Sequence, residues 1–142
     1  MSDLDPFDLQ RFVDAQEGVI ERVRAELAAG RKESHWMWFV FPQFAGLGSS
    51  PMSVRFALSS RAEAAAYLAH PVLGPRLRDL TGLALGNENR DARAIFGPVD
   101  ALKFRSSLTL FAEAAEPGNV FRRALDCFFD GQPDPATLAR LD

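Results

Sequence analysis

The stretch SRAEAAAYLAHPVLGPRLRDLTGLALG, residues 60–86, carries the clearest helix signals of the chain. Ser60 and Glu63 form a capping box, in which each side chain can bond a backbone N–H that the first helical turn leaves free. The alanine-rich run that follows is interrupted at His70-Pro71, because proline disfavours helical backbone in the residue before it. An amphipathic pattern then continues to Gly86, formed by Val72, Leu73, Leu77, Leu80, Leu83 and Leu85. The stretch therefore predicts two consecutive helices.

Helix signals of the same kind occur toward the N-terminus. Apolar residues between Phe7 and Leu27 recur every three or four positions, which is the spacing of one helix face. Gly30 follows as a predicted C-cap, since glycine adopts the left-handed backbone in which many helices end. Gly18 can divide the stretch into two helices.

Toward the C-terminus, each predicted helix has a residue that starts it and a residue that stops it. Asp91 can cap a short helix that stops at Gly97, and Pro98 opens the next helix, which ends before Pro117-Gly118. Asn119 is the predicted cap of a helix over residues 120–129.

The pairs Asp5-Pro6 and Asp134-Pro135 predict a helix near each end of the chain, because each places a capping carboxylate before a proline at the first helical position. No stretch shows the sustained alternation of apolar and polar residues that is typical of strands. The sequence therefore predicts an all-α, single-domain bundle of six to eight short helices over residues 1–142.

Composition fits one ordinary globular domain, with 142 residues of which 47% are hydrophobic and 25% charged. A net charge of -3 gives no general attraction for nucleic acid or anionic lipid, so neither is an expected partner. The first residues lack the basic and apolar regions of a signal peptide, and no later run reaches about 18 apolar residues. We expect a cytoplasmic protein.

Cysteine and histidine are rare in this chain. The single cysteine, Cys127, excludes an intramolecular disulfide, and with only His35 and His70 there is no Cys/His set for a zinc site. No metal and no cofactor is predicted. Cys127 lies in the run ALDCFF, which predicts a buried position.

The segment KESHWMWFVFPQ, residues 32–43, holds both tryptophans and one of the two histidines. In one interpretation it is a short core helix, capped by Ser34 and stopped before Pro42, whose buried rings are Trp36, Trp38, Phe39 and Phe41. In the other, its polar residues line a cleft in which a ring can stack and an anion can pair, namely Lys32, Ser34, His35 and Gln43. His35 is then the candidate catalytic residue, because imidazole can act as a general acid or base near neutral pH.

Two further segments contain residues that can bind a ligand. The loop at residues 46–53 can hold a phosphate with its backbone N–H groups and with Ser49 and Ser50, or it is an ordinary loop whose serines cap a helix. In the predicted helix after Pro98, three polar residues share one face within about one turn, namely Lys103, Ser106 and Ser107. Serines inside a helix indicate either tight helix packing or a polar pocket wall.

Together these residues resemble a known family. The patterns GxKxSHWMWFxFPQ at residues 30–43, GLGS at 46–49, HPxLGxRL at 70–77 and IFGxxDxxKxxSSxTLF at 95–111 resemble the domain of unknown function 1810 family. The resemblance covers nearly the whole chain and implies a small helical protein of mostly bacterial distribution, in a family where some members are labelled calpastatin. It implies a fold and no particular reaction. The sequence departs from the family pattern at Phe56, where tyrosine is common, and at Leu108, where methionine is usual.

The leading hypothesis is a small-molecule-binding protein, which can also be an enzyme. Its ligand is expected to be phosphorylated or nucleotide-like, with the lysines pairing anionic groups and a tryptophan stacking on a base. The predicted pocket joins Lys32, Ser34, His35, Trp36, Trp38, Gln43, Ser49, Ser50, Lys103, Ser106 and Ser107. The alternative is a non-enzymatic protein-protein interaction domain that docks its partner on an apolar surface.

Overall fold

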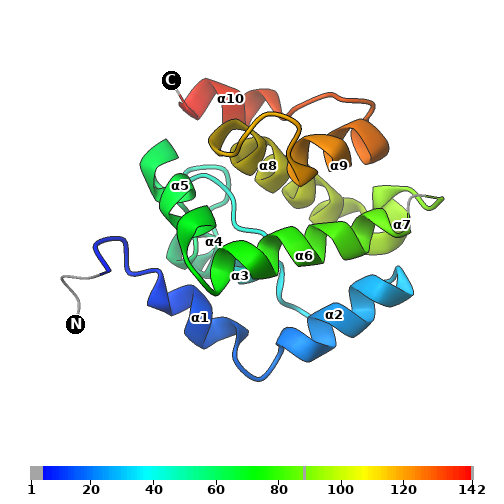
Figure 1. The fold of residues 1–142 in the computed structure, drawn as a ribbon, viewed down its shortest axis with the longest axis horizontal. Coiled ribbons are helices and arrows are strands. Elements are labelled where there is room, and N and C mark those ends of the chain that lie inside the picture. The colour runs from blue at the N-terminus through cyan, green and yellow to red at the C-terminus, as the bar shows by residue number, and fades with distance from the viewer. Residues whose placement is uncertain (1–4, 88, 142) are drawn as a thin grey trace.

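The computed structural model describes residues 5–87 and 89–141. The signal-peptide expectation at residues 1–4 and the outermost limits of the predicted domain lie outside these residues. Within them the chain forms ten helices, and strand pairing is limited to one isolated parallel bridge between Phe44 and Leu58 (Figure 1). The all-α prediction is confirmed, although the helices outnumber the expected six to eight. One additional helix lies at residues 51–55, so it begins inside the predicted loop at residues 46–53 and is capped by one of the serines of that loop.

The helices are α1 (Gln10–Gln16), α2 (Ile20–Ala29), α3 (Met37–Val40), α4 (Pro51–Arg55), α5 (Arg61–Ala69), α6 (Leu73–Leu85), α7 (Ala92–Phe96), α8 (Pro98–Ala114), α9 (Val120–Phe129) and α10 (Pro135–Leu141). In Figure 1, α9 and α10 lie at the top of the molecule, α1 and α2 lie at the bottom, and α6 crosses between them. Among the described residues, none of the helices is both long and apolar enough to span a bilayer.

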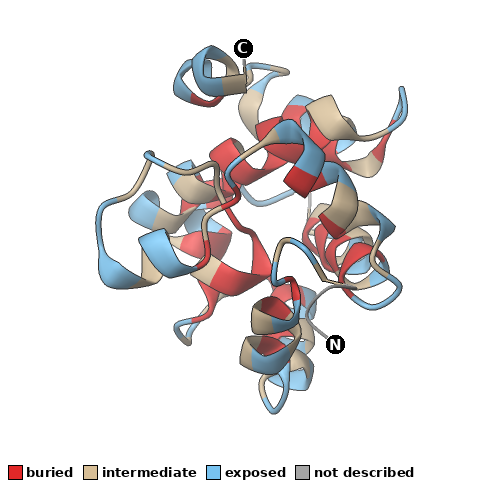
Figure 2. Cartoon of the chain, turned by 90° about the vertical axis from the view of Figure 1, so that its left-hand side faces the viewer, coloured by how far each residue is buried: buried red, intermediate tan, exposed pale blue. Residues whose placement is uncertain are grey.

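Helix α8 is the centre of the core, since it contacts α5, α7, α9 and α10. Every residue from Ser106 to Ala112 is buried, so this part of α8 is covered on all sides. Figure 2 shows the buried residues gathered in the middle of the molecule, on the inward faces of the surrounding helices. Residues at both ends of α8 reach the surface, and one end carries Lys103.

The predicted caps are confirmed at three helix starts. Ser60 Oγ accepts a hydrogen bond from the N–H of Glu63 at 3.0 Å, and the Glu63 carboxylate accepts from the N–H of Ser59 at 2.8 Å, one residue earlier than an ideal capping box. Asp91 and Asn119 cap α7 and α9 through hydrogen bonds of 2.8 Å each. These ends are fixed by contacts within one turn, which is why the sequence could place them.

The glycine predictions hold as well. Gly18 separates α1 from α2, and Gly30 ends α2 in the left-handed conformation with a φ of 74°. The Asp134-Pro135 pair begins α10 as expected. The Asp5-Pro6 pair acts differently, because α1 begins only at Gln10.

Asp5 caps α1 from a preceding turn. Its carboxylate accepts hydrogen bonds from the N–H groups of Leu9 and Gln10 at 2.7 and 2.9 Å. Asp8 has a φ of 52°, in the left-handed region, so a helix that starts at Pro6 cannot pass through it. The prediction that Asp5 caps a helix was therefore correct. The prediction that this helix starts at Pro6 was wrong, because α1 starts at Gln10.

Two other expectations are corrected. Ser34 does not cap the aromatic helix, because α3 begins at Met37 with Trp36 at its N-cap position, while the Ser34 hydroxyl donates to Glu26. Cys127 is exposed and not buried. The buried face of α9 is formed by Phe121, Ala124 and Leu125, and at about 100° per residue Cys127 points away from the centre of this face.

His70 has a capping function that the sequence did not reveal. Its Nδ1 accepts hydrogen bonds from the N–H groups of Val72 and Leu73 at 3.1 and 3.2 Å, just where α6 begins. We expect His70→Ala to lower the free energy of unfolding by about 1 kcal/mol in urea denaturation. His70→Asn retains an acceptor at a similar position and should recover most of this loss. Equal destabilisation by both substitutions would contradict the capping role.

Candidate functional site

The two lysines of the chain meet at one carboxylate. Lys32 Nζ lies 2.8 Å from Oδ2 of Asp100, and Lys103 Nζ lies 3.7 Å from Oδ1 of the same residue. Lys32 is nearly covered, with 7% of its side chain exposed, whereas 24% of Lys103 is exposed. We call Lys32, Asp100 and Lys103 the lysine–aspartate cluster. The two ammonium groups therefore lie close together, and Lys103 is the one that lines a surface groove.

Each lysine of the cluster also faces a tryptophan. Lys32 Nζ is 4.9 Å from the centroid of the Trp36 ring, and Lys103 Nζ is 5.3 Å from that of Trp38. These distances are typical of cation–π contacts. Trp36 is only 1% exposed, so its ring belongs to the core and leaves no face for a ligand. Trp38 is half-buried, which makes it the tryptophan with surface that a ligand can reach.

Beneath the cluster, Glu26 holds the segment before α3 in place. Its buried carboxylate accepts hydrogen bonds from the N–H groups of Glu33 at 2.8 Å and Ser34 at 3.1 Å, from the Ser34 hydroxyl, and from Trp36 Nε1 at 2.9 Å. Burial by itself raises the pKa of Glu26, but these hydrogen bonds stabilise the charged form and lower the pKa to about 2. Ser34 is therefore engaged in structure.

Lys103 lines a surface groove of about 320 Å³, which we call the Lys103 groove. Its lining comes from four parts of the chain: Gln43 after α3, Leu47 and Gly48 in the following loop, Val99, Leu102, Lys103 and Ser106 on α8, and Asp134 and Ala136 at the start of α10. The structure thus brings together Gln43, Lys103 and Ser106, which the sequence predicted to share a pocket. Gly48, from the loop at residues 46–53, lines the same groove.

The wall formed by α10 is fixed by hydrogen bonds to α8. Ser106 Oγ donates to Asp134 Oδ2 at 2.9 Å, and the N–H of Asp134 donates to Thr109 Oγ1 at 2.8 Å. Asp134 also accepts from the hydroxyl of Thr137 at 2.6 Å. The Asp134 carboxylate is therefore held by the chain itself, while Lys103 extends into the groove with a single ion pair.

The remaining predicted residues do not line this groove. Ser50 caps α4 by accepting from the N–H of Ser53 at 3.2 Å, and the neighbouring Ser49 is exposed. Ser107 is buried in α8, where its hydroxyl has no hydrogen-bond partner among the described residues. His35 is exposed before α3, and no described residue forms a hydrogen bond with its ring.

Sequence reasoning overlooked two carboxylates. Asp100 precedes Lys103 by three residues on one helix, a spacing that predicts an ion pair and could have identified it. Glu26 gave no comparable signal, since its donors lie seven to ten residues away beyond the end of α2.

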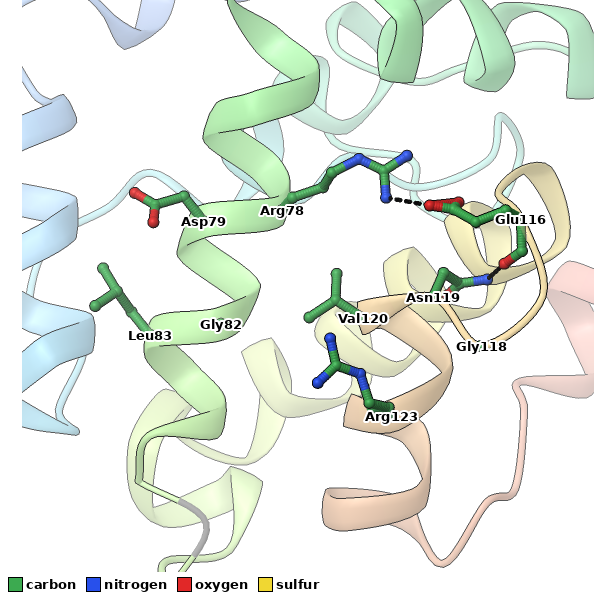
Figure 3. A pocket seen from close by; sticks show the side chains of 9 residues that line it. All are labelled: Arg78, Asp79, Gly82, Leu83, Glu116, Gly118, Asn119, Val120 and Arg123. Carbon is green, nitrogen blue, oxygen red and sulfur yellow. Dashed lines mark hydrogen bonds and ion pairs between the residues drawn. The ribbon is translucent and has the colours of Figure 1, made fainter.

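A larger cavity, of about 630 Å³, lies elsewhere, between α6 and the start of α9 (Figure 3). Figure 3 shows Arg78 reaching from α6 toward Glu116, with which it forms an ion pair at 3.1 Å. Asp79, on the same helix, pairs with Arg24. Most of the charges around this cavity are therefore already paired, and none of the predicted site residues lines it.

The fold is that of a small all-helical protein, and its Lys103 groove is lined by charged, polar and aliphatic residues. A family model described as Protein of unknown function (DUF1810) matches residues 6–141, and the chain belongs to this family. The chain is similar to a conserved hypothetical protein from Mycobacterium tuberculosis with a known crystal structure, and the two sequences are 53% identical. The match covers 96% of this chain and 98% of that chain, with a TM-score of 0.94. A comparison with curated proteins gives no match.

Proposed function

We propose that the protein binds a small phosphorylated or nucleotide-like ligand in the Lys103 groove. The observation that carries this proposal is the convergence of Lys103 and Gln43, from different segments, on one concave surface. Lys103 Nζ is 3.7 Å from Asp100, beyond hydrogen-bond distance, and the Gln43 amide forms no hydrogen bond with a described residue. Both groups therefore have unused donors for a ligand.

Each part of the groove has a distinct role in this proposal. Lys103 pairs with the anionic group of the ligand. Asp100 positions the Lys103 side chain through its ion pair and is itself held by Lys32. Leu47 and Leu102 contact the less polar part of the ligand, with the half-buried ring of Trp38 beside Lys103. His35 is the candidate general acid or base for any reaction, a role that rests on its chemistry alone.

The location and partners of the protein belong to the same proposal. A cytoplasmic location is supported by the single cysteine, which excludes an intramolecular disulfide. The net charge of -3 argues against nucleic acid and anionic membranes as partners.

Thermal unfolding with a panel of nucleotides, NAD, ADP-ribose and sugar phosphates tests the proposal. A ligand present at about a hundred times its dissociation constant adds about 2.7 kcal/mol to stability, which raises the melting temperature by several degrees. We expect this shift to be lost in Lys103→Met, which keeps much of the apolar stem and removes the charge. Lys32→Ala is the weaker test, because Lys32 is largely buried and its removal also disturbs the core.

Arg93→Gln is the matched control, since Arg93 is exposed on α7 and does not line the groove. It removes the same charge and should leave the ligand-induced shift intact. Loss of the shift in both variants would assign it to overall charge, and no shift with any compound would contradict the proposal.

The second candidate is protein-protein interaction without catalysis. It is favoured by Val99 and Leu102, which are each 65% exposed at the rim of the Lys103 groove. Two results together would support this candidate: no compound of the panel raises the melting temperature, and Leu102→Ser abolishes association with a protein partner.

A further inference from the structure

A second groove, of about 510 Å³, is lined in part by Glu26 and by three arginines. Its lining consists of Arg22, Ala25, Glu26 and Ala29 on α2, Arg31 and Glu33 in the following loop, and Arg90 between α6 and α7. We call it the arginine groove. Ala25 and Ala29 are too short to fill the space between the charged side chains.

Two of these arginines have no partner within the described part of the chain. The side chains of Arg22 and Arg90 make no ion pair and no hydrogen bond there, so both guanidinium groups are open to a ligand. Arg31 has one contact, an ion pair with Glu33 at 4.0 Å, which is the outer limit for such a pair. A guanidinium has five donors, so most of this capacity is unused.

Asn87 fixes the position of Arg90 at the groove, since its carbonyl oxygen accepts a hydrogen bond from the N–H of Arg90 at 2.9 Å. Asn87 donates to Leu27 O at 2.8 Å and to Leu83 O at 3.2 Å, which ties the loop after α6 to the end of α2. Arg90 then lies against Gly30, where an added Cβ would come within 2.7 Å of Asn87 Oδ1 and 3.3 Å of Arg90 Cδ. The absence of a side chain at Gly30 therefore permits the close approach that brings Arg90 over α2.

The acidic residues of the groove do not cancel this positive charge. The Glu26 carboxylate is already bound by four donors of the chain, and Glu33 is exposed with 68% of its side chain in solvent. Arginine side chains from three segments line this groove, and a guanidinium can donate several hydrogen bonds to one oxyanion. The protein as a whole carries a charge of -3, which disfavours an anionic bilayer or a nucleic acid as the source of that oxyanion.

We propose that the arginine groove binds a small soluble compound bearing a phosphate monoester or pyrophosphate group, held by Arg22, Arg31 and Arg90. This site is separate from the Lys103 groove, so it goes beyond the function proposed above. Binding through guanidinium groups should weaken as salt is added, because exposed charges are screened.

Titration calorimetry with pyrophosphate at low ionic strength tests this site in the full chain. We expect saturable binding that is weakened by about tenfold or more in Arg90→Gln and in Arg22→Gln, since each removes a charge-assisted contact. Arg22 is exposed on α2, and its side chain makes no ion pair or hydrogen bond with a described residue. Arg22→Gln should therefore fold and test the site even if Arg90→Gln does not fold.

Two controls separate this site from other effects. Arg93→Gln removes the same charge from the neighbouring helix and should bind pyrophosphate as the wild type does, while Lys103→Met measures how much of the binding belongs to the other groove. Equal weakening in Arg93→Gln would show a general charge effect and overturn the proposal. Absence of saturable binding at low salt, or its loss only in Lys103→Met, would overturn it as well.

Discussion

Replacing Glu26 with glutamine is expected to lower the free energy of unfolding by about 3 kcal/mol at pH 7, the largest loss from any change near the site. Four donors end on this carboxylate, including the Trp36 indole and the Ser34 hydroxyl. A neutral amide offers one weaker acceptor and turns an NH₂ group toward some of these donors. Urea denaturation of the wild type and of Glu26→Gln measures the difference.

The same substitution has a distinct pH dependence. Hydrogen bonding lowers the pKa of Glu26 from 4.5 to about 2 in the folded protein. A lowered folded-state pKa gives stability that is fully present above about pH 4.5 and is lost as the pH falls toward 2. The difference in stability between the wild type and Glu26→Gln should therefore shrink over this range, since glutamine does not titrate.

Glu33→Gln is the matched control for this experiment. Glu33 is a neighbouring carboxylate, but it is exposed and its only ion pair is at 4.0 Å. We expect its variant to stay within about 0.5 kcal/mol of the wild type. A constant difference between wild type and Glu26→Gln from pH 5 to pH 2 would refute the assigned role of the Glu26 charge.

Gly74→Ala is expected to have the second large effect, a loss of about 3 kcal/mol in stability. Gly74 lies in the first turn of α6, and an added Cβ would come within 2.0 Å of the Leu68 carbonyl oxygen and 2.9 Å of its carbonyl carbon. Both obstacles are backbone atoms of α5, so α5 and α6 must move apart. Thermal unfolding should show a melting temperature lower by roughly 10 °C.

Gly82→Ala adds the same methyl group to the same helix. Gly82 is exposed, and nothing lies within 4 Å of the position of its added Cβ. Alanine has the higher helix propensity, so this variant should be more stable by about 0.5 to 1 kcal/mol. Opposite signs for the two variants are the expected result, and a Gly74→Ala protein as stable as the wild type would show that α5 and α6 are not in tight contact there.

The candidate site was predictable only in part. Lys103 and Gln43 were identified from residue chemistry, and they line one groove. Ser50 and Ser34 are chemically as suitable for a ligand, but one caps α4 and the other bonds Glu26. A serine hydroxyl bonds whatever group the fold places next to it, so its residue type alone does not decide between a structural and a binding role.

What the sequence determined by itself was the set of helices and most of their ends. Ser60, Asp91 and Asn119 cap the helices predicted for them because each contact spans only three residues along the chain. The all-α class followed in the same way from periodicity and the absence of strand patterns.

Tertiary structure alone decided which residues meet across the fold. It joined Lys32 to Asp100, placed Arg90 over α2, and left Cys127 at the surface. These outcomes depend on how the helices pack, and packing is set by many weak apolar contacts between residues far apart in the chain. No local pattern encodes such contacts, which is why the helices could be predicted from the sequence and the composition of the grooves could not.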